Sequence, residues 1–342
     1  MINTMDEKER QRRRQQKKRK ALRLKRKQER ERKIKRKYML KMGLLLLSVF
    51  SVLIVGIVVA SKREKAEAIR IAEEKKKEEE RVVFDYGNAI KGLTLYDKDE
   101  HTITKERADE LLLDYATQCN FDEKLYTKRV KDLLMNHFEA RDFVFNYPLY
   151  YGTATSTDAA KASVKDIDFK KQIPELYQWD MRWGYKKYGS DAMGLTGCGP
   201  TALSMVAMYM LKSDKFTPDY IADFALENGY AVEGSGTSWN LMDEGAMQLG
   251  LYGFDVLPVE DDMATQLLAG RPLICIMGPG HFTNTGHFIV IKGYEVGDTS
   301  EGIYKNGKFL INDPNCKENT QKKWSFDELQ NEIGSVWAYT NE

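Results

Sequence analysis

Cys198 is the residue whose surroundings best suit covalent chemistry. It lies in the string Gly197-Cys198-Gly199-Pro200, directly before a strongly apolar run. Proline suits the first turn of a helix, where its missing N–H is not needed, so Cys198 is expected at or just before a helix amino terminus. The unpaired N–H groups and positive dipole end there stabilise a thiolate. The string therefore predicts a nucleophilic cysteine, and a small buried cysteine at a helix start is the plain alternative.

A nucleophilic thiol needs a general base, and the chain has four histidines. His101 and His137 lie among helical patterns before residue 170, which leaves His281 and His287. His287 begins the β-rich run HFIVIKGY, so a strand would hold its ring. His281 lies in a loop rich in glycine and proline, where it would be less well fixed. His287 is therefore the predicted base.

An imidazole base needs a third group that orients it through its other nitrogen. Asp313 follows the predicted strand KFLIN and begins an Asp-Pro turn. Its neighbours Asn312 and Asn315 are alternatives for the same role. Asp313 is the best candidate.

The oxyanion formed during acyl transfer needs hydrogen-bond donors. The backbone N–H of Cys198 is one of them. Gln178, in the string YQWDMRWGY twenty residues upstream, offers a side-chain amide for the second.

At this point the chain resembles the papain-fold cysteine peptidases related to the double-glycine leader peptidases of bacteriocin exporters. The resemblance covers roughly residues 172–340 and rests on four separated strings in the right order: QWDMRWGYKKYG, TGCGPTALSM, MGPGHFTNTGHFIVI and NDP. It implies Cys198 as nucleophile, His287 as general base and acid, and Asp313 as the orienting residue. Gln178 would belong to the oxyanion hole. The implied fold class is α+β, papain-like, with a helical part carrying the cysteine and an antiparallel sheet carrying the histidine and aspartate.

Other site chemistries fit the sequence less well. Cys275, His281 and His287 are close in sequence, but no pair has the spacing of a zinc site, and Cys275 in PLICIM is more simply a core strand residue. We therefore expect no metal and no other cofactor. The string Gly234-Ser235-Gly236 lacks the nucleophile elbow of a serine hydrolase.

The remaining cysteines and three of the tryptophans each allow two interpretations. A disulfide outside the cell is possible among Cys119, Cys275 and Cys316. Three tryptophans either line substrate subsites or belong to the core: Trp179, Trp183 and Trp239.

The remaining patterns supply the elements that must position these residues. Strands are expected near 272–277, 287–295, 307–312 and 335–340. Helices are expected from Thr217-Pro218 to Asn228, from Thr237 or Ser238 to about Leu249, and from Asp261 to Leu268. Ser325 and Glu328 form a capping box, and Asn306-Gly307 predicts a hairpin turn before the strand that leads to Asp313.

Residues 82–170 show two helical patterns and no residue that suggests chemistry. The first pattern begins at Thr104, and the second covers about Asp122 to Phe145. The apolar positions of the second are Leu125, Val130, Leu133, Leu134 and Phe138. The turn-rich stretch 147–163 marks a boundary with the next unit. We expect a small helical subdomain that packs on the following domain, with an inhibitory pro-segment as the alternative.

Residues 42–61 form an apolar run of twenty positions without a charge. At helical rise they extend roughly 30 Å, the thickness of a bilayer's hydrocarbon core, so they predict a transmembrane helix. Basic residues from Lys33 to Lys41 precede it, and the positive-inside rule then places the carboxyl-terminal part outside the cell. A cleavable signal peptide is the alternative, since Val58-Val59-Ala60 has a small-residue pattern. The exporter peptidases are fused to a transporter and act on the cytoplasmic side, so leader removal is not carried over.

The net charge of +2 conceals two opposite regions in the 342 residues. Residues 1–41 carry +15 and residues 82–342 carry −14, and between them the stalk 62–81 is nearly balanced, as in a solvated helix. A chain that is basic at one end only is not a nucleic-acid-binding globule. Its 42% hydrophobic residues also exclude a wholly disordered protein.

The sequence thus predicts five parts: a basic cytoplasmic tail (1–41), a transmembrane helix (42–61), a charged helical stalk (62–81), a helical subdomain (82–170) and a papain-like peptidase domain (171–342). The predicted function is that of a membrane-anchored extracytoplasmic thiol hydrolase that cleaves a peptide or amide bond in a peptide or cell-wall-derived substrate. An acyl transferase with the same triad is one alternative. A catalytically silent surface domain that binds a cell-wall or protein partner is another. No nucleic-acid partner is expected, and the sequence does not indicate an oligomeric state.

Overall fold

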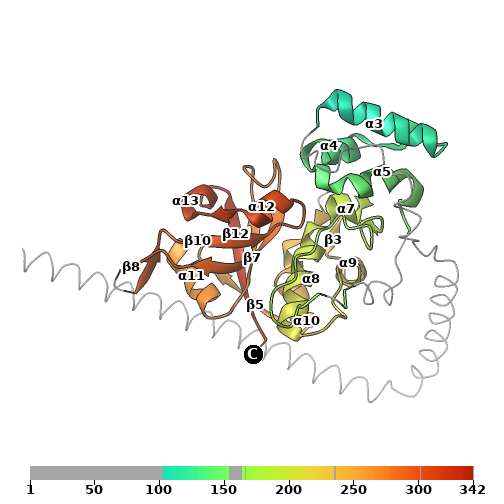
Figure 1. Ribbon diagram of the computed structural model, residues 1–342. Coiled ribbons are helices and arrows are strands. Elements are labelled where there is room, and N and C mark those ends of the chain that lie inside the picture. Colours follow the sequence, from blue (N-terminus) through green and yellow to red (C-terminus); the bar gives the residue numbers. More distant parts are fainter. Residues whose placement is uncertain (1–102, 154–163, 166, 235, 301, 342) are drawn as a thin grey trace, which may run out of the picture. The chain divides into compact units, whose positions relative to one another are not determined.

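The computed structural model describes residues 103–153, 164–165, 167–234, 236–300 and 302–341 (Figure 1). They belong to the second of two units, Arg81–Glu342, and combine helices with an antiparallel sheet, so the fold class is α+β. The basic tail, the transmembrane helix expected at 42–61 and the stalk lie outside the described residues. Within the described part, no helix has both the length and the apolar character needed to cross a bilayer.

The first helices lie together in Figure 1, from turquoise to green. They are α3 (Lys105–Gln118), η1 (Glu123–Leu125), α4 (Lys128–Asn136), η2 (Phe138–Ala140) and α5 (Arg141–Tyr150). The predicted start of α3 is confirmed, because the Thr104 hydroxyl accepts a hydrogen bond from the Arg107 backbone N–H at 3.2 Å.

The single helix predicted for Asp122 to Phe145 is wrong. The side chain of Asp122 caps η1 and that of Thr127 caps α4, so the chain starts a new helical element twice within one apolar pattern. Leu125 consequently lies outside the core with half of its surface exposed, whereas the other four apolar positions of the pattern are buried.

The helices α3 to α5 share one apolar cluster with the segment that follows them. Buried side chains of that segment complete the cluster: Tyr177, Trp179, Met181, Tyr185 and Ala192. Burying each such aromatic side chain contributes about 1.5–3 kcal/mol. Asp191 adds polar links, since it accepts a hydrogen bond from the Tyr147 hydroxyl at 3.0 Å and lies 3.2 Å from the Arg129 guanidinium. The helical segment is therefore packed onto the chain that leads to Cys198.

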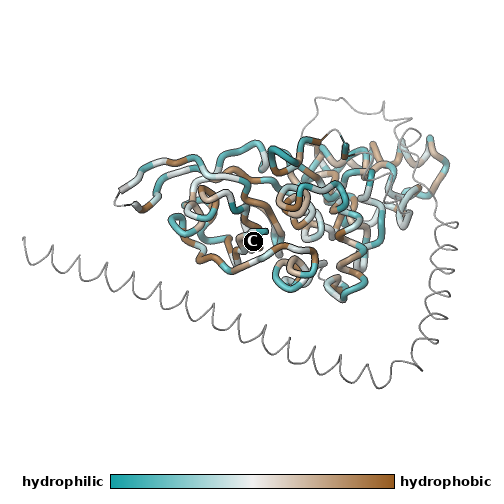
Figure 2. Tube along the Cα trace, turned by 90° about the horizontal axis from the view of Figure 1, so that it is seen from below, coloured by the Kyte–Doolittle hydropathy of each residue, from teal (hydrophilic) through white to brown (hydrophobic). Residues whose placement is uncertain are grey.

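The chain reaches the cysteine through a short ribbon and two helices. These are β1 (Lys187–Tyr188), β2 (Asp191–Ala192), α7 (Met193–Thr196) and α8 (Cys198–Leu211). Helix α8 is buried from Gly199 to Met208, and Figure 2 shows hydrophobic residues concentrated along the packed helices and strands. Gly199 permits this packing, because a Cβ there would lie 2.6 Å from the Thr237 hydroxyl. The helix predicted from Pro218 is present as α9 (Pro218–Glu227).

Six strands within the described residues form one antiparallel sheet in the order β11-β10-β7-β6-β12-β5. Their bounds are β5 (Tyr252–Val256), β6 (Leu273–Met277), β7 (His287–Glu295), β10 (Lys308–Asn312), β11 (Lys323–Trp324) and β12 (Ile333–Thr340). The four predicted strands correspond to β6, β7, β10 and β12. The unpredicted β5 and β11 are the two edges, where partial exposure or a two-residue length weakens the hydrophobic signal.

The hairpin predicted at Asn306-Gly307 is wrong. Strands β8 (Asp298–Ser300) and β9 (Ile303–Lys305) pair with each other, and β10 pairs with β7 and β11 instead. Asn306 adopts a φ of 55°, and the turn there directs the chain from the ribbon back into the sheet.

Two helix starts differ in part from the predicted ones. Ser238 does cap, but it begins η3 (Trp239–Leu241), and α10 (Glu244–Gln248) follows as a separate helix. Helix α11 (Glu260–Leu268) already contains Asp261, whose carboxylate accepts from the Tyr304 backbone N–H at 3.0 Å.

The remaining elements are β3 (Ala231–Val232), β4 (Gly236–Thr237), α12 (Lys317–Gln321) and α13 (Phe326–Leu329). The capping box before α13 is confirmed, since Glu328 accepts from the backbone N–H and hydroxyl of Ser325 at 2.8 and 2.6 Å.

Candidate active site

The pairing of β7 with β10 places a histidine beside an aspartate. His287 is the first residue of β7, and Asp313 follows the last residue of β10. The strands are antiparallel with Asn312 opposite Val290, so the start of one lies next to the end of the other. His287 Nε2 lies 2.7 Å from Asp313 Oδ1, and both side chains are buried. The two predicted partners are thus in hydrogen-bond contact.

The neighbouring asparagines do not take the place of Asp313. The Asn312 side chain donates to the Pro174 carbonyl at 2.9 Å and accepts from Lys292 Nζ at 2.5 Å. Asn315 contributes its backbone N–H, which donates to Asp313 Oδ1 at 2.8 Å.

Further hydrogen bonds hold Asp313 in place and, where they reach its carboxylate, favour its ionised form. Asn319 Nδ2 donates to Asp313 Oδ2 at 2.8 Å, and the Asp313 backbone N–H donates to the Thr320 hydroxyl at 2.9 Å. Burial alone would raise the pKa of Asp313, but the charge and hydrogen bond of His287, followed by the bonds from Asn319 and Asn315, hold that pKa below its ordinary value. Sequence reasoning missed Asn319, because its approach to Asp313 depends on the turn into α12.

The imidazole of His287 lies close enough to Cys198 to act on the pKa of its thiol. Since His287 Nε2 faces Asp313, the nitrogen left for the thiol is Nδ1. Burial raises the pKa of Cys198, but the hydrogen bond and charge of His287 outweigh it with help from the backbone N–H groups of Phe288 and Gly199, so the net pKa is lowered. The Gly199 N–H is one of the unpaired donors of the first turn of α8.

The pKa of His287 shifts in the opposite direction. Burial lowers it, but the Asp313 carboxylate and the hydrogen bond to Cys198 more than compensate, and the net pKa is raised. A lowered thiol pKa beside a raised imidazole pKa favours a thiolate–imidazolium pair near neutral pH.

Gln178 bonds to both segments that carry the reactive groups. Its Nε2 donates to the Gly194 carbonyl in α7 at 3.0 Å, and its backbone N–H donates to the carbonyl of Pro314, the residue after Asp313, at 2.8 Å. The Gly194 bond uses one of the two Nε2 hydrogens, so a second donor remains. Gln178 Oε1 is buried and has no hydrogen-bond partner among the described residues.

The position of Gly194 is itself fixed by packing. A Cβ at Gly194 would lie 2.4 Å from the Phe143 ring of α5, which is fully buried. The Phe143 ring therefore leaves no room for a side chain at Gly194, whose carbonyl accepts from the Gln178 amide.

The alternative residues from the sequence are used differently. His281 Nδ1 is hydrogen-bonded to Glu332, and the His281 backbone N–H donates to the same carboxylate at 2.8 Å. Cys275 is buried within β6, and burial raises its pKa. The four cysteines are all free within the described residues.

The three tryptophans separate into two groups. Trp183 is fully buried and Trp179 nearly so; their Nε1 atoms donate to the carbonyls of Tyr177 and Asn315 at 2.7 and 2.9 Å. Trp239 is 52% exposed and packs edge-on to Trp337 at 6.2 Å between ring centroids.

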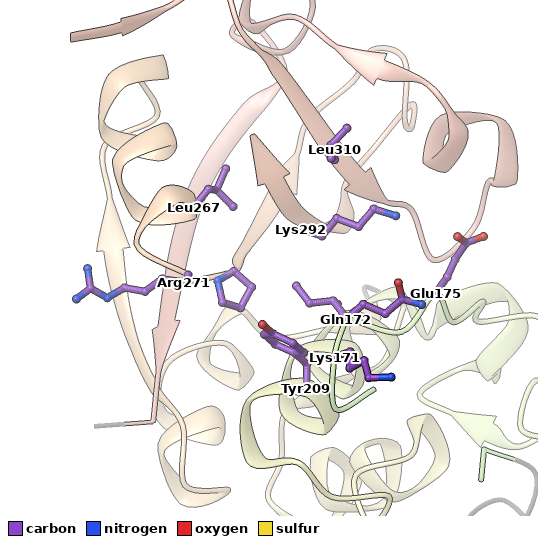
Figure 3. A pocket seen from close by; sticks show the side chains of 11 residues that line it. Lys171, Gln172, Glu175, Tyr209, Leu267, Arg271, Lys292 and Leu310 are labelled. Carbon is purple, nitrogen blue, oxygen red and sulfur yellow. The ribbon is translucent and has the colours of Figure 1, made fainter. Parts of the chain in front are cut away.

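A pocket of about 360 Å³ lies elsewhere in the fold (Figure 3). Its lining includes Lys171, Glu175, Tyr209 and Lys292, and it contains neither Cys198, His287, Asp313 nor Gln178. We therefore do not associate it with the cysteine chemistry.

Comparison with known proteins adds one match. The family model described as “Peptidase_C39 like family” matches residues 170–342, about half of the chain. The matched stretch contains Gln178, Cys198, His287 and Asp313. No curated protein matches the chain.

Proposed function

The chain belongs to the Peptidase_C39 like family, and from that premise we propose that it is a cysteine peptidase with Cys198 as its nucleophile. The observation that carries the proposal is the hydrogen bond of His287 to Asp313, together with the effect of the same imidazole on Cys198, whose pKa it lowers. Three groups joined in this order constitute an activated nucleophile, a base and an orienting carboxylate.

The reaction proceeds through an acyl-enzyme. The Cys198 thiolate attacks the carbonyl carbon of a peptide or amide bond, and the carbonyl oxygen becomes an oxyanion. The Cys198 backbone N–H and the second Nε2 hydrogen of Gln178 donate to that oxyanion. The C–N bond then breaks as His287 Nδ1 passes its proton to the leaving nitrogen.

Water completes the cycle. His287, now neutral, removes a proton from a water molecule, and the resulting hydroxide attacks the thioester carbonyl. The C–S bond breaks, the acid product leaves, and the thiolate–imidazolium pair forms again. Asp313 keeps the imidazole oriented throughout and stabilises its positive charge.

We also propose that this domain is held outside the cell by residues 42–61, with residues 1–41 in the cytoplasm. The uncharged run of twenty residues and the basic cluster before it support this placement. The substrate would then be a surface peptide or a cell-wall-derived peptide. An acidic domain is not drawn to anionic polymers by its net charge, so selection would occur at the cleft around Cys198.

The test compares material released from intact cells that express the wild type or Cys198→Ala. Peptides or wall fragments with a new carboxyl terminus are expected from the wild type alone, whereas acyl transfer would instead join the acyl part to another amine. Identical released material from both strains would contradict a peptidase. Protease added outside intact cells should remove the carboxyl-terminal domain and spare residues 1–41; loss of both, or of neither, would contradict the proposed topology.

A further inference from the structure

Three side chains of the kinds that bind metals lie close to one another near the triad, and none of them belongs to the triad. His137 directly follows α4, Glu139 lies in η2, and Cys316 precedes α12. One ligand atom from each of the three lies within 4.8 Å of the other two. Imidazole, carboxylate and thiolate are the ligands that zinc takes in proteins. We propose that His137, Glu139 and Cys316 bind one zinc ion.

The other contacts of these side chains leave ligand atoms available. His137 Nδ1 is buried and has no hydrogen-bond partner among the described residues, an unfavourable state that a metal bond would relieve. One Glu139 oxygen accepts from the Lys317 backbone N–H at 3.0 Å, which leaves further lone pairs on the carboxylate. Cys316 Sγ accepts from the Asn319 backbone N–H at 3.5 Å, a bond that also suits a thiolate.

The spacing of the ligand atoms needs little adjustment. With zinc bonds of about 2.0–2.3 Å, tetrahedral geometry puts ligand atoms about 3.5 Å apart, so side-chain rotations that close the group by about 1 Å suffice. Cys316 binds as the thiolate and loses its proton to solvent, and water fills the fourth position. The sulfur and nitrogen ligands favour zinc over magnesium or calcium, which prefer oxygen.

The ion would join two segments that are distant in sequence. His137 and Glu139 come from the helical segment, whereas Cys316 follows Asp313 by three residues. His137 is also close enough to Asp313 and His287 for their charges to affect its pKa. Zinc would therefore hold the loop that carries Asp313 against η2.

The test uses the full chain carrying Cys198→Ala, because the triad thiolate can itself bind zinc. After removal of metal with a chelator, calorimetric titration with Zn²⁺ is expected to show one ion per chain. Titration with Co²⁺ is expected to show the charge-transfer absorption of a cobalt–thiolate bond. Adding Cys316→Ser should abolish that absorption. It should also weaken zinc binding at least about tenfold, since one of the three side chains bonded directly to the metal is lost. The matched control adds Cys119→Ser instead. Cys119 is a free cysteine in the helical segment that carries His137, and its substitution should change neither the absorption nor the affinity for zinc.

Glu139→Gln is the second ligand variant, used if Cys316→Ser does not fold, because it keeps the size of the side chain and removes its charge. Zinc should raise the melting temperature of Cys198→Ala and should raise it less once Glu139→Gln is added. Absence of binding in Cys198→Ala, or equal binding after Cys316→Ser or Glu139→Gln, would overturn the proposed site. Because the test chain has no nucleophile, either result is independent of the proposed peptidase activity.

Discussion

The alkylation of Cys198 by iodoacetamide gives the sharpest test of the thiolate–imidazolium pair. In the wild type, His287 lowers the pKa of Cys198 by its hydrogen bond and charge, against a burial that raises it. His287→Ala removes both contributions of the imidazole and leaves burial opposed only by the backbone N–H groups of Phe288 and Gly199. The substitution should therefore move the Cys198 pKa from below to above its ordinary value.

The size of the effect follows from the reactivity of thiols. At pH 6 a thiol with the ordinary pKa of about 8.5 is only about 0.3% ionised. Nucleophilicity falls about threefold for each unit by which the pKa is lowered, so the largest net gain at pH 6 is about 10-fold over an ordinary thiol. With burial added to the loss of the imidazolium, His287→Ala should slow alkylation at pH 6 by about 10- to 100-fold.

The assay follows each cysteine by mass spectrometry of digested protein at several pH values. The wild-type rate at Cys198 should change little across the range in which the pair persists, whereas the His287→Ala rate should rise about tenfold per pH unit while the thiol is largely protonated. His281→Ala is the matched control, because His281 is bonded to Glu332, and it should leave the Cys198 rate unchanged. A wild-type rate no faster than that of an ordinary thiol, or one insensitive to His287→Ala, would refute the reasoning.

Three further substitutions probe the support of the site. Asn319→Ala removes a donor to the Asp313 carboxylate, and since such a bond contributes about 1.5–3 kcal/mol, kcat should fall about tenfold or more with KM little changed; a wild-type kcat would contradict that role. Gly194→Ala forces a methyl group onto the Phe143 ring and should lower the free energy of unfolding in urea by about 1–3 kcal/mol, an effect that adding Phe143→Leu should partly reverse. The pKa of Asp313 is lower in the folded chain, so its ionisation stabilises the fold above the unfolded pKa of about 3.9, and this contribution is lost as pH falls through the lower folded pKa. Asp313→Asn should therefore make unfolding less dependent on pH in this acid range, and an unchanged acid profile would speak against it.

The sequence located the contacting groups because each stands where a strong local signal marks the end of an element. Pro200 places Cys198 at a helix start, the β-rich run begins at His287, and the Asp-Pro turn places Asp313 after a strand. Antiparallel pairing of neighbouring strands then brings the last two together, as the strand pattern allows.

What escaped prediction depends on contacts between distant segments or on weak signals. The bond from Asn319 to Asp313 requires the chain to turn back at α12, which no periodicity records. The break before α4 depends on the Thr127 cap, which lies within an uninterrupted apolar pattern. The approach of His137 to Cys316 arises only when the helical segment packs against the rest of the chain.

The two hydrogen bonds of Gln178 also bear on biosynthesis. One partner, Gly194, is synthesised soon after Gln178, but the other, Pro314, lies near the end of the chain. Asp313 is equally late, so a nascent chain that has emerged only as far as β7 carries the thiol and its imidazole without the carboxylate that orients the ring. Contacts of such long sequence separation form late in folding. The growing polypeptide would thus lack the complete Cys198, His287 and Asp313 set until nearly all of it has been made.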